Sequence, residues 1–132
     1  MTDAAGTRDI RTMHIGELAE RTGLLLRTIR HYDDVGILPA ASRTEGGFRV
    51  YTEGDVERLL LIRRMKPLGF TLEEMQELLD VTDALDAERD QRRRELLRAS
   101  LEAFRSSAEE RREKLAQTLV RADEFIERLS RY

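Results

Sequence analysis

The chain has 132 residues, enough for one domain or for one small domain with an appendage. It carries 23 basic and 26 acidic residues, a net charge of −3 that excludes a uniformly basic nucleic-acid coat but not a local basic patch. It has no cysteine, which excludes disulfides, thiolate metal sites and a cysteine nucleophile in this chain. A charged content of 37% favours long solvated helices over a thick sheet core.

Residues 1–12 are predicted to form a flexible, polar tail. They contain no apolar run that could serve as a signal-peptide core, and the longest apolar run, Leu59–Ile62, is too short to span a bilayer. We therefore expect a soluble, cytoplasmic protein with no membrane contact.

A first short helix is predicted by apolar residues at helical spacing, namely Ile15, Leu18, Ala19 and Thr22. Gly23 interrupts this pattern, and a second short helix follows over residues 26–35, closed by Gly36 and Pro39. Two short helices joined around a glycine fit a helix-turn-helix, although any other corner of two helices would give the same pattern.

Residues 41–51 are predicted to form a small two-stranded hairpin, or wing. The glycines of the segment Thr44–Gly47 supply the positive φ that a tight turn requires, and β-favouring residues flank it. We expect Phe48 and Tyr51 to pack in the core of this wing.

Two further helices are predicted from their N-terminal caps. Thr52 is expected to cap the first helix, with Asp55 near the positive end of its dipole. Thr71 and Glu74 form a T-x-x-E capping box that opens the second. The apolar residues expected to face inward are Val56, Leu59, Leu60 and Met65 in the first helix, and Leu72, Met75, Leu78 and Leu79 in the second.

Neither proline nor glycine occurs from about Leu85 to Arg131, which predicts a helix of roughly 40 residues, about 60 Å long. Its apolar residues follow a heptad seam with gaps at Arg111 and Thr118: Leu97, Leu101, Phe104, Ala108, Leu115, Ala122, Phe125 and Leu129. The N-terminal domain is too small to cover this seam. The helix therefore needs a partner helix, or a fold-back at Ser106-Ser107.

Residues 81–132 are predicted to be a helical region for dimerisation and effector binding. Their twelve basic and twelve acidic residues balance, as expected for the solvated exterior of a coiled coil. The residues expected to form the dimer contact are Leu97, Leu101, Phe104, Ala108 and Leu115.

Several motifs occur in order and at close spacing over residues 13–80. They are Ile15-Gly-Glu-Leu-Ala19, Arg27-Thr-Ile-Arg30, His31-Tyr-Asp33, Gly36-Ile-Leu-Pro39, Arg43, Gly47-Phe-Arg-Val-Tyr51 and Leu68-Gly-Phe-Thr-Leu-Glu73. Together they resemble the DNA-binding domain of the MerR family of bacterial transcription regulators. The resemblance implies a mainly α fold, with a winged helix-turn-helix domain at 13–80, a second helical wing, and a long dimerisation helix in an antiparallel coiled coil. It also implies a homodimer that binds double-stranded promoter DNA, works with bacterial RNA polymerase, and distorts the DNA to activate or repress transcription.

The geometry of the second helix agrees with this resemblance independently. With Ile29 at the buried centre, Arg27 and His31 fall near the opposite side. Arg30 and Thr28 flank them. This face suits a major groove, because arginine makes paired hydrogen bonds to guanine and threonine contacts a thymine methyl or a phosphate. The alternative is a solvated helix face on which Arg30 pairs with the nearby Asp34.

Further contacts are expected to position the protein on the DNA backbone. The ring of Tyr32 either packs under the wing or offers its hydroxyl to a phosphate, and the resemblance favours the phosphate contact. In the wing, Arg43 and Arg49 are expected to reach phosphates, and Tyr51 to offer its hydroxyl. Lys66 is placed near phosphate on the second wing. The predicted DNA-binding residues are therefore Arg27, Thr28, Arg30, His31, Tyr32, Arg43, Arg49, Tyr51 and Lys66.

One position departs from the family pattern. Members commonly carry serine or threonine where this chain has Leu25, and that hydroxyl would cap the second helix. Leucine cannot cap, so the helix is expected to lose about 0.5–2 kcal/mol. Two alternatives remain open: the run Leu24–Leu26 packs inward, or the cap shifts to Thr22.

The signal to which the chain responds is left open. Relatives that sense metals or redox state use cysteines, which are absent here, so we expect no metal and no cofactor. About 50 residues follow Leu79, too few for the separate ligand domain of drug-sensing relatives. A small apolar pocket between helices, lined by Phe104 and Phe125, remains an alternative to simple packing by these rings.

Three classes of function are compared. The first is a sequence-specific transcription regulator that binds an inverted repeat as a homodimer. The second is a coiled-coil adaptor between proteins that does not bind DNA, which the acidic net charge and the long apolar seam favour. The third, an enzyme, is excluded because the sequence holds no nucleophile with a plausible base, no phosphate-binding glycine loop and no metal-ligand set.

Overall fold

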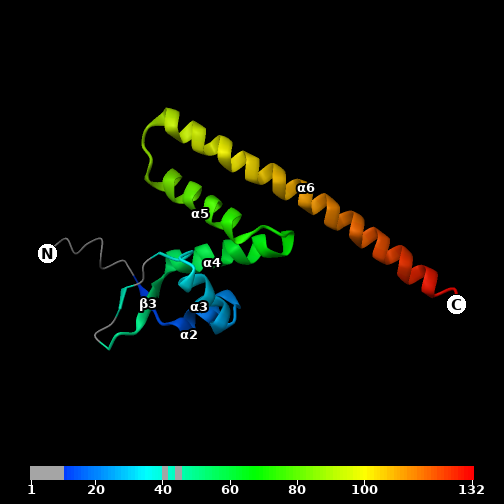
Figure 1. The fold of residues 1–132 in the computed structure, drawn as a ribbon, viewed down its shortest axis with the longest axis horizontal. Helices are drawn as coiled ribbons and strands as arrows, with labels where there is room; N and C mark the ends of the chain where they lie inside the picture. Colours follow the sequence, from blue (N-terminus) through cyan, green and yellow to red (C-terminus); the bar gives the residue numbers. More distant parts are fainter. Residues whose placement is uncertain (1–10, 40–41, 44–45) are drawn as a thin grey trace. The chain divides into compact units, whose positions relative to one another are not determined.

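A computed structural model of the chain describes residues 11–39, 42–43 and 46–132. It is mainly helical and divides into two compact units, Met1–Met65 and Lys66–Tyr132. Figure 1 shows the helices and strands of each unit in the order of the chain. The predicted domains, 13–80 and 81–132, meet after residue 80, whereas the compact units meet after Met65. The functional roles of the two predicted domains stay a prediction.

The first unit contains a helix-turn-helix and a three-stranded sheet. Its elements are β1 (Thr12–Met13), α2 (Ile15–Thr22), α3 (Leu26–Asp34), β2 (Ser42–Arg43), β3 (Arg49–Thr52) and α4 (Glu53–Met65). Gly23 ends α2 in the left-handed conformation, with φ of 72°, and its N–H donates to the carbonyl of Ala19. Because a glycine adopts this conformation without steric cost, the chain turns there into α3.

The predicted hairpin is confirmed, and a strand is added to it. The strand order is β1-β3-β2, with antiparallel pairing throughout. Strand β1 was not predicted, and Thr12, which we expected in a flexible tail, pairs with Thr52 of β3. A two-residue strand carries too short a pattern to be seen in a sequence.

Buried apolar side chains and polar contacts of α4 hold the first unit together. Leu18, Ile29 and Leu59 are fully buried, one from each of its three helices. Arg21 in α2 forms a two-pronged ion pair with Glu53 at the start of α4. Arg63 donates to the carbonyl of Thr22, so α4 also ties down the turn of the helix-turn-helix. These contacts present α3 and the wing from a common support.

The predicted cap of α4 is confirmed. The backbone N–H of Asp55 donates to the hydroxyl of Thr52, and the carboxylate of Asp55 accepts from the backbone N–H of Thr52 at 2.9 Å. Burial raises the pKa of Asp55, while the hydrogen bonds that its carboxylate accepts from the backbone N–H and the hydroxyl of Thr52 act in the opposite direction. Of the expected inward residues, Leu60 is only half-buried, whereas Ile62, which we did not include, is fully buried.

The second unit consists of a short 3-10 helix and two long helices. They are η1 (Lys66–Leu68), α5 (Leu72–Ala87) and α6 (Gln91–Leu129), and α5 and α6 lie side by side in opposite directions (Figure 1). The capping box of α5 is confirmed, with Glu74 N–H donating to the Thr71 hydroxyl and Thr71 N–H to the Glu74 carboxylate. The hydrogen bonds from Thr71 are the main cause that lowers the pKa of Glu74. Met75, Leu78 and Leu79 are buried as expected, and Leu72 is half-buried.

The long helix begins later than predicted and does not fold back. Leu85 belongs to α5, and α6 starts after its N-cap Asp90, whose carboxylate accepts from the N–H of Arg93 at 3.0 Å. Arg94 donates to the carbonyls of Leu85 and Glu88 and closes the turn between the helices. The helix continues through Ser106 and Ser107, so the alternative of a fold-back there is wrong.

Arg111 explains one of the two gaps in the apolar seam. Its guanidinium lies 4.0 Å from the ring centroid of Phe70 and donates to the carbonyl of Leu68 and the carboxylate of Glu74. A cation over an aromatic face is attracted by the ring while its N–H groups still serve acceptors. Arg111 thus fastens α6 to the start of α5 within one chain.

The predicted dimer residues divide into two groups. Leu97, Phe104 and Ala108 are half-buried within the single chain, and the Phe104 ring centroid lies 6.5 Å from that of Phe70. Leu101 and Leu115 are exposed, and so is every residue from 112 to 132. The first part of the seam therefore serves the packing of α6 on α5, and the second part lacks any cover in the described chain.

A cleft of about 420 Å³ lies between α5 and α6, and Phe104 and Phe70 are among its lining residues. Phe125 does not line this cleft, so the predicted apolar pocket does not bring the two phenylalanines together. None of the helices in the described ranges is long and apolar enough to cross a membrane.

Candidate nucleic-acid interface

The second helix of the helix-turn-helix, α3, presents basic side chains on its outward face. Ile29 and Tyr32 are buried, while Arg27, Arg30 and His31 are exposed and Thr28 is half-buried. This is the arrangement expected from the helical periodicity.

Neither arginine of this face is neutralised within the described part of the chain. No carboxylate there forms an ion pair with Arg27 or Arg30, and the alternative pairing of Arg30 with Asp34 is not found. Two guanidinium groups are therefore available on the outward face of α3 for an acceptor outside the chain. Paired donors of this kind fit the O6 and N7 of guanine.

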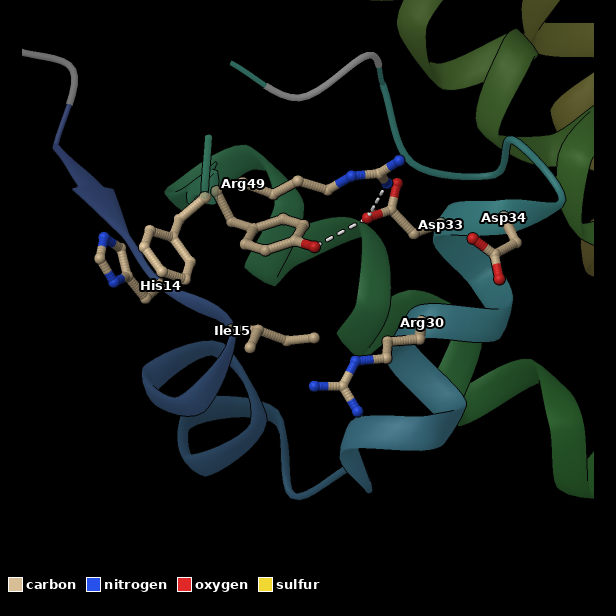
Figure 2. A pocket seen from close by; sticks show the side chains of 8 residues that line it. His14, Ile15, Arg30, Asp33, Asp34 and Arg49 are labelled. Atoms are coloured by element: carbon tan, nitrogen blue, oxygen red, sulfur yellow. Dashed lines mark hydrogen bonds and ion pairs between the residues drawn. The ribbon is translucent and has the colours of Figure 1, made fainter. Parts of the chain in front are cut away.

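The wing strand β3 is joined to α3 through one carboxylate. Arg49 lies 2.5 Å from Oδ2 of Asp33, and the hydroxyl of Tyr51 donates to the same oxygen at 2.7 Å. Figure 2 shows both interactions as dashed lines that meet at Asp33 of α3. The ion pair with Asp33 raises the pKa of Arg49. Tyr51, predicted to offer its hydroxyl to DNA, donates its hydrogen bond to Asp33 within the chain.

A cleft of about 420 Å³ opens between the wing and the helix-turn-helix. Arg30 comes to it from α3 and Arg49 from β3, as Figure 2 shows. It is lined by His14, Ile15, Arg30, Asp33, Asp34, Phe48, Arg49 and Tyr51. The cleft thus brings together three predicted DNA-binding residues, Arg30, Arg49 and Tyr51, and also Asp33, for which the sequence suggested no role.

The remaining predicted site residues lie in different surroundings. Tyr32 is 5% exposed, which agrees with the packing alternative, and its phosphate contact stays a prediction. Lys66 is exposed at the start of the second unit. Arg43 belongs to β2, but its side chain lies outside the described residues.

Phe48 does not pack in the wing as expected. It is 67% exposed, and its ring lies against that of His14, with 6.3 Å between the centroids. Strand β3 begins only at Arg49, so Phe48 lies in the turn before it and not over a face of the sheet. The interpretation of Phe48 as a core residue is therefore wrong.

The departure at Leu25 has the expected consequence for α3. Leu25 is the N-cap residue, with extended backbone, and no side chain caps the helix. Thr22 does not replace it, because its hydroxyl donates to the carbonyl of Leu18 and accepts from Leu24 N–H. Leu25 and Leu26 are exposed, so the alternative that this run packs inward is wrong for both.

Replacing Leu25 by serine is expected to stabilise the chain by about 0.5–2 kcal/mol, because the hydroxyl can accept from the first turn of α3. The backbone at this position, with φ of −72° and ψ of 148°, already has the geometry of a cap. Urea denaturation followed by circular dichroism measures the change. Leu26→Ser is the matched control, since it also removes an exposed leucine but lies inside the helix. Equal stabilities of the two variants would contradict the capping argument.

The buried hydroxyl of Tyr51 makes stability depend on alkaline pH. Burial, and then the hydrogen bond to Asp33, raise the pKa of Tyr51 from 10.0 to about 12. Between these values the unfolded chain releases this proton and the folded chain retains it, so stability falls as pH rises from 10 to about 12. Denaturation at a series of pH values should show that Tyr51→Phe loses less stability over this pH range than the unmodified chain does. Tyr132→Phe, at an exposed tyrosine, should lose stability as the unmodified chain does; parallel curves for all three would refute this.

A helix-turn-helix with a β-hairpin wing and unpaired arginines on its second helix defines a winged helix-turn-helix DNA-binding protein. Comparison with known proteins gives the family. Residues 13–82 match the model of the MerR HTH family regulatory protein, and residues 56–131 match the model described as MerR, DNA binding. The chain belongs to the MerR family of regulatory proteins.

Individual relatives agree with this assignment. The mercuric resistance operon regulatory protein of Bacillus cereus is 48% identical over 73 residues, which cover 55% of this chain and 55% of that protein. The regulator ZntR of Escherichia coli K12 is 48% identical over 67 residues, 51% of this chain and 48% of that protein. The chain thus spans about half the length of these curated relatives.

Solved structures show the same fold over most of the chain. HiNmlR, a MerR family regulator lacking the sensor domain and bound to promoter DNA, has a TM-score of 0.65 and 25% identity, covering 86% of this chain and 80% of that one. A MerR family regulator from Listeria monocytogenes has a TM-score of 0.64 and 27% identity, covering 86% and 83%. These relatives support a DNA-binding regulator rather than the adaptor without DNA binding. The family consists of regulators and not of enzymes, which confirms the exclusion of an enzyme.

Proposed function

We propose that this chain is a transcription regulator that binds promoter DNA as a homodimer, with α3 in the major groove and the wing along the backbone. The observation that carries this proposal is the outward face of α3, where Arg27 and Arg30 have no acidic partner in the described chain. A related regulator bound to promoter DNA supports it.

The two kinds of basic residue take different parts in this proposal. Arg27 and Arg30 read base edges, with Thr28 and His31 beside them on the same face. Arg43, Arg49 and Lys66 hold phosphates, which fixes the register on the duplex without reading its sequence. Residues 21–51 contain five basic and three acidic residues, so a weakly charged module must rely on well-placed contacts. Dimerisation doubles the number of these contacts.

The dimer forms through the uncovered part of α6. Successive residues of an α-helix are rotated by about 100°, which brings Leu115, Leu119, Ala122, Ile126 and Leu129 onto one face. All five are exposed. A continuous apolar face of this kind marks an interaction surface, and a second copy supplies an identical face that covers it symmetrically. Because Leu97, Phe104 and Ala108 of the seam already pack within the chain, the second copy pairs with the part after Arg111, in an antiparallel coiled coil.

The symmetry of the dimer sets the form of its operator. Two α3 helices related by a two-fold axis require an inverted repeat, with half-sites on one side of the duplex. Regulation proceeds through distortion of the promoter DNA and contact with bacterial RNA polymerase, in the cytoplasm. These steps come from the family and are part of the proposal.

Selection of genomic fragments with the purified protein, followed by footprinting, tests the function. We expect a protected inverted repeat within a promoter. With about 6–10 phosphate contacts per dimer, its affinity should fall roughly 10³–10⁵-fold between 50 and 200 mM salt. Failure to protect any sequence selectively at low salt, with a dimer confirmed by sedimentation, would contradict the proposal.

A further inference from the structure

Asp33 receives two donors from the wing on a single buried oxygen. Its side chain is 8% exposed, and Oδ2 accepts both from Arg49 and from the hydroxyl of Tyr51. Both donors belong to β3, while Asp33 lies in the last turn of α3, the helix that carries Arg27 and Arg30. One carboxylate therefore joins the wing to the basic helix face (Figure 2).

Strand β3 packs on β1, α2 and α4, and the contacts to Asp33 join it directly to α3. A charge-assisted hydrogen bond to a largely buried carboxylate is short, directional and costly to break.

Arg49 can be held by Asp33 and still reach DNA. The guanidinium has five N–H donors, and its Nη1 atom lies against Asp33. The side chain of Arg49 remains 39% exposed beside the cleft. Asp33 itself is too buried to contact DNA, so any effect it has on binding must act through the side chains it holds.

We propose that Asp33 is a positioning residue that fixes β3 and Arg49 relative to Arg27 and Arg30, so that phosphate contacts and base contacts fall in one register. This inference rests on the proposed function. The inference adds one point to that function. Asp33 does not touch the DNA, yet the selectivity of the protein for its operator depends on it, and not only the affinity. A phosphate contact held in place restricts the protein to one docking geometry, and base edges are read only in that geometry.

Asp33→Asn tests this role with Asp34→Asn as its matched control. Both changes remove one negative charge from the end of α3. Asp34 lines the same cleft, but it is exposed and forms no hydrogen bond to the described residues of the wing. The readout is the ratio of affinities for the selected operator and for a scrambled duplex at the same salt concentration. Asp34→Asn should raise both affinities alike and leave the ratio unchanged. Asp33→Asn should lower the ratio about tenfold, the effect of a lost charge-assisted bond.

Two further variants separate positioning from a general loss of structure. In an Arg49→Gln background, the additional change Asp33→Asn should alter the ratio less than twofold, because the residue it positions is gone. Tyr51→Phe, which keeps the ring and one of the two interactions, should lower the ratio by a smaller factor than Asp33→Asn. If circular dichroism shows that Asp33→Asn does not fold, Tyr51→Phe serves as the test variant in its place.

Hydrogen exchange of the β3 amides gives a readout that needs no DNA. Asp33→Asn should lower the protection of residues 49–52, and Asp34→Asn should not. If the unmodified chain selects no operator, the proposed function fails and the role in selectivity falls with it, whatever the exchange shows. If the operator is selected but both variants keep the same ratio, only the inference about Asp33 is overturned. A higher operator affinity in Asp33→Asn than in Asp34→Asn would also overturn it, since Asp33 would then compete with DNA for Arg49.

Discussion

Replacing Arg27 and Arg30 together by alanine is expected to reduce operator affinity to the level of non-specific binding while leaving the dimer intact. Each bidentate arginine contact to guanine contributes about 1–3 kcal/mol of discrimination. Two such contacts in each protomer would account for about 4–12 kcal/mol in the dimer, comparable with the whole difference between specific and non-specific binding. The expected loss is therefore roughly 10³-fold or more at constant salt.

The measurement is a titration of the operator and of a scrambled duplex by anisotropy, with sedimentation to establish the dimer. Arg92→Ala with Arg98→Ala is the matched control, because it removes the same charge from exposed positions on α6. This control should weaken binding to both duplexes by a small and equal factor. Selection with the single variants should relax one base position in each half-site. An Arg27→Ala, Arg30→Ala protein that still protects the operator at the same concentration would show that α3 does not read the bases.

The parts of the structure that the sequence predicted well are held by local interactions. The capping box of Thr71 and Glu74 spans three residues, and the end of α2 at Gly23 depends on the φ of one residue. Their spacing is visible in the chain, so no knowledge of the tertiary structure was needed. The exposed face of α3 was predicted for the same reason, since helical periodicity alone separates Ile29 from Arg27.

The parts that were missed depend on residues far apart in the chain. Asp33 meets Tyr51 across 18 positions, and Arg111 meets Glu74 across 37. In the sequence, Asp33 was one more acidic residue and Arg111 a gap in an apolar seam. Only their surroundings show that one holds the wing and that the other stacks on an aromatic ring. Long-range contacts of polar residues leave no periodic trace, which is why the sequence predicted which residues face outward but not which residue positions them.

Charged substitutions on the uncovered face of α6 are expected to convert the dimer to a monomer and, with it, to abolish stable operator binding. Leu119 and Ile126 are 63% and 61% exposed in the single chain and lie on the same helix face. Pairing with a second copy would bury both side chains. Burial of one leucine or isoleucine stabilises the dimer by about 1.5–3 kcal/mol. Leu119→Lys with Ile126→Lys would affect four side chains per dimer and would also place like charges in the contact.

Val120→Lys provides the matched control, since Val120 is exposed to a similar extent, at 55%, but points away from this face by helical rotation. Sedimentation velocity at micromolar concentration should give a monomer for the double variant and a dimer for the control. Circular dichroism should show the first unit still folded in both, because residues 112–132 have no buried side chain in the single chain. A monomer presents one α3 to one half-site, so protection of the inverted repeat should disappear although Arg27 and Arg30 are unchanged. If the double variant remains a dimer, the second copy must pair with the part of α6 before Arg111, and α6 would have to separate from α5 to allow it.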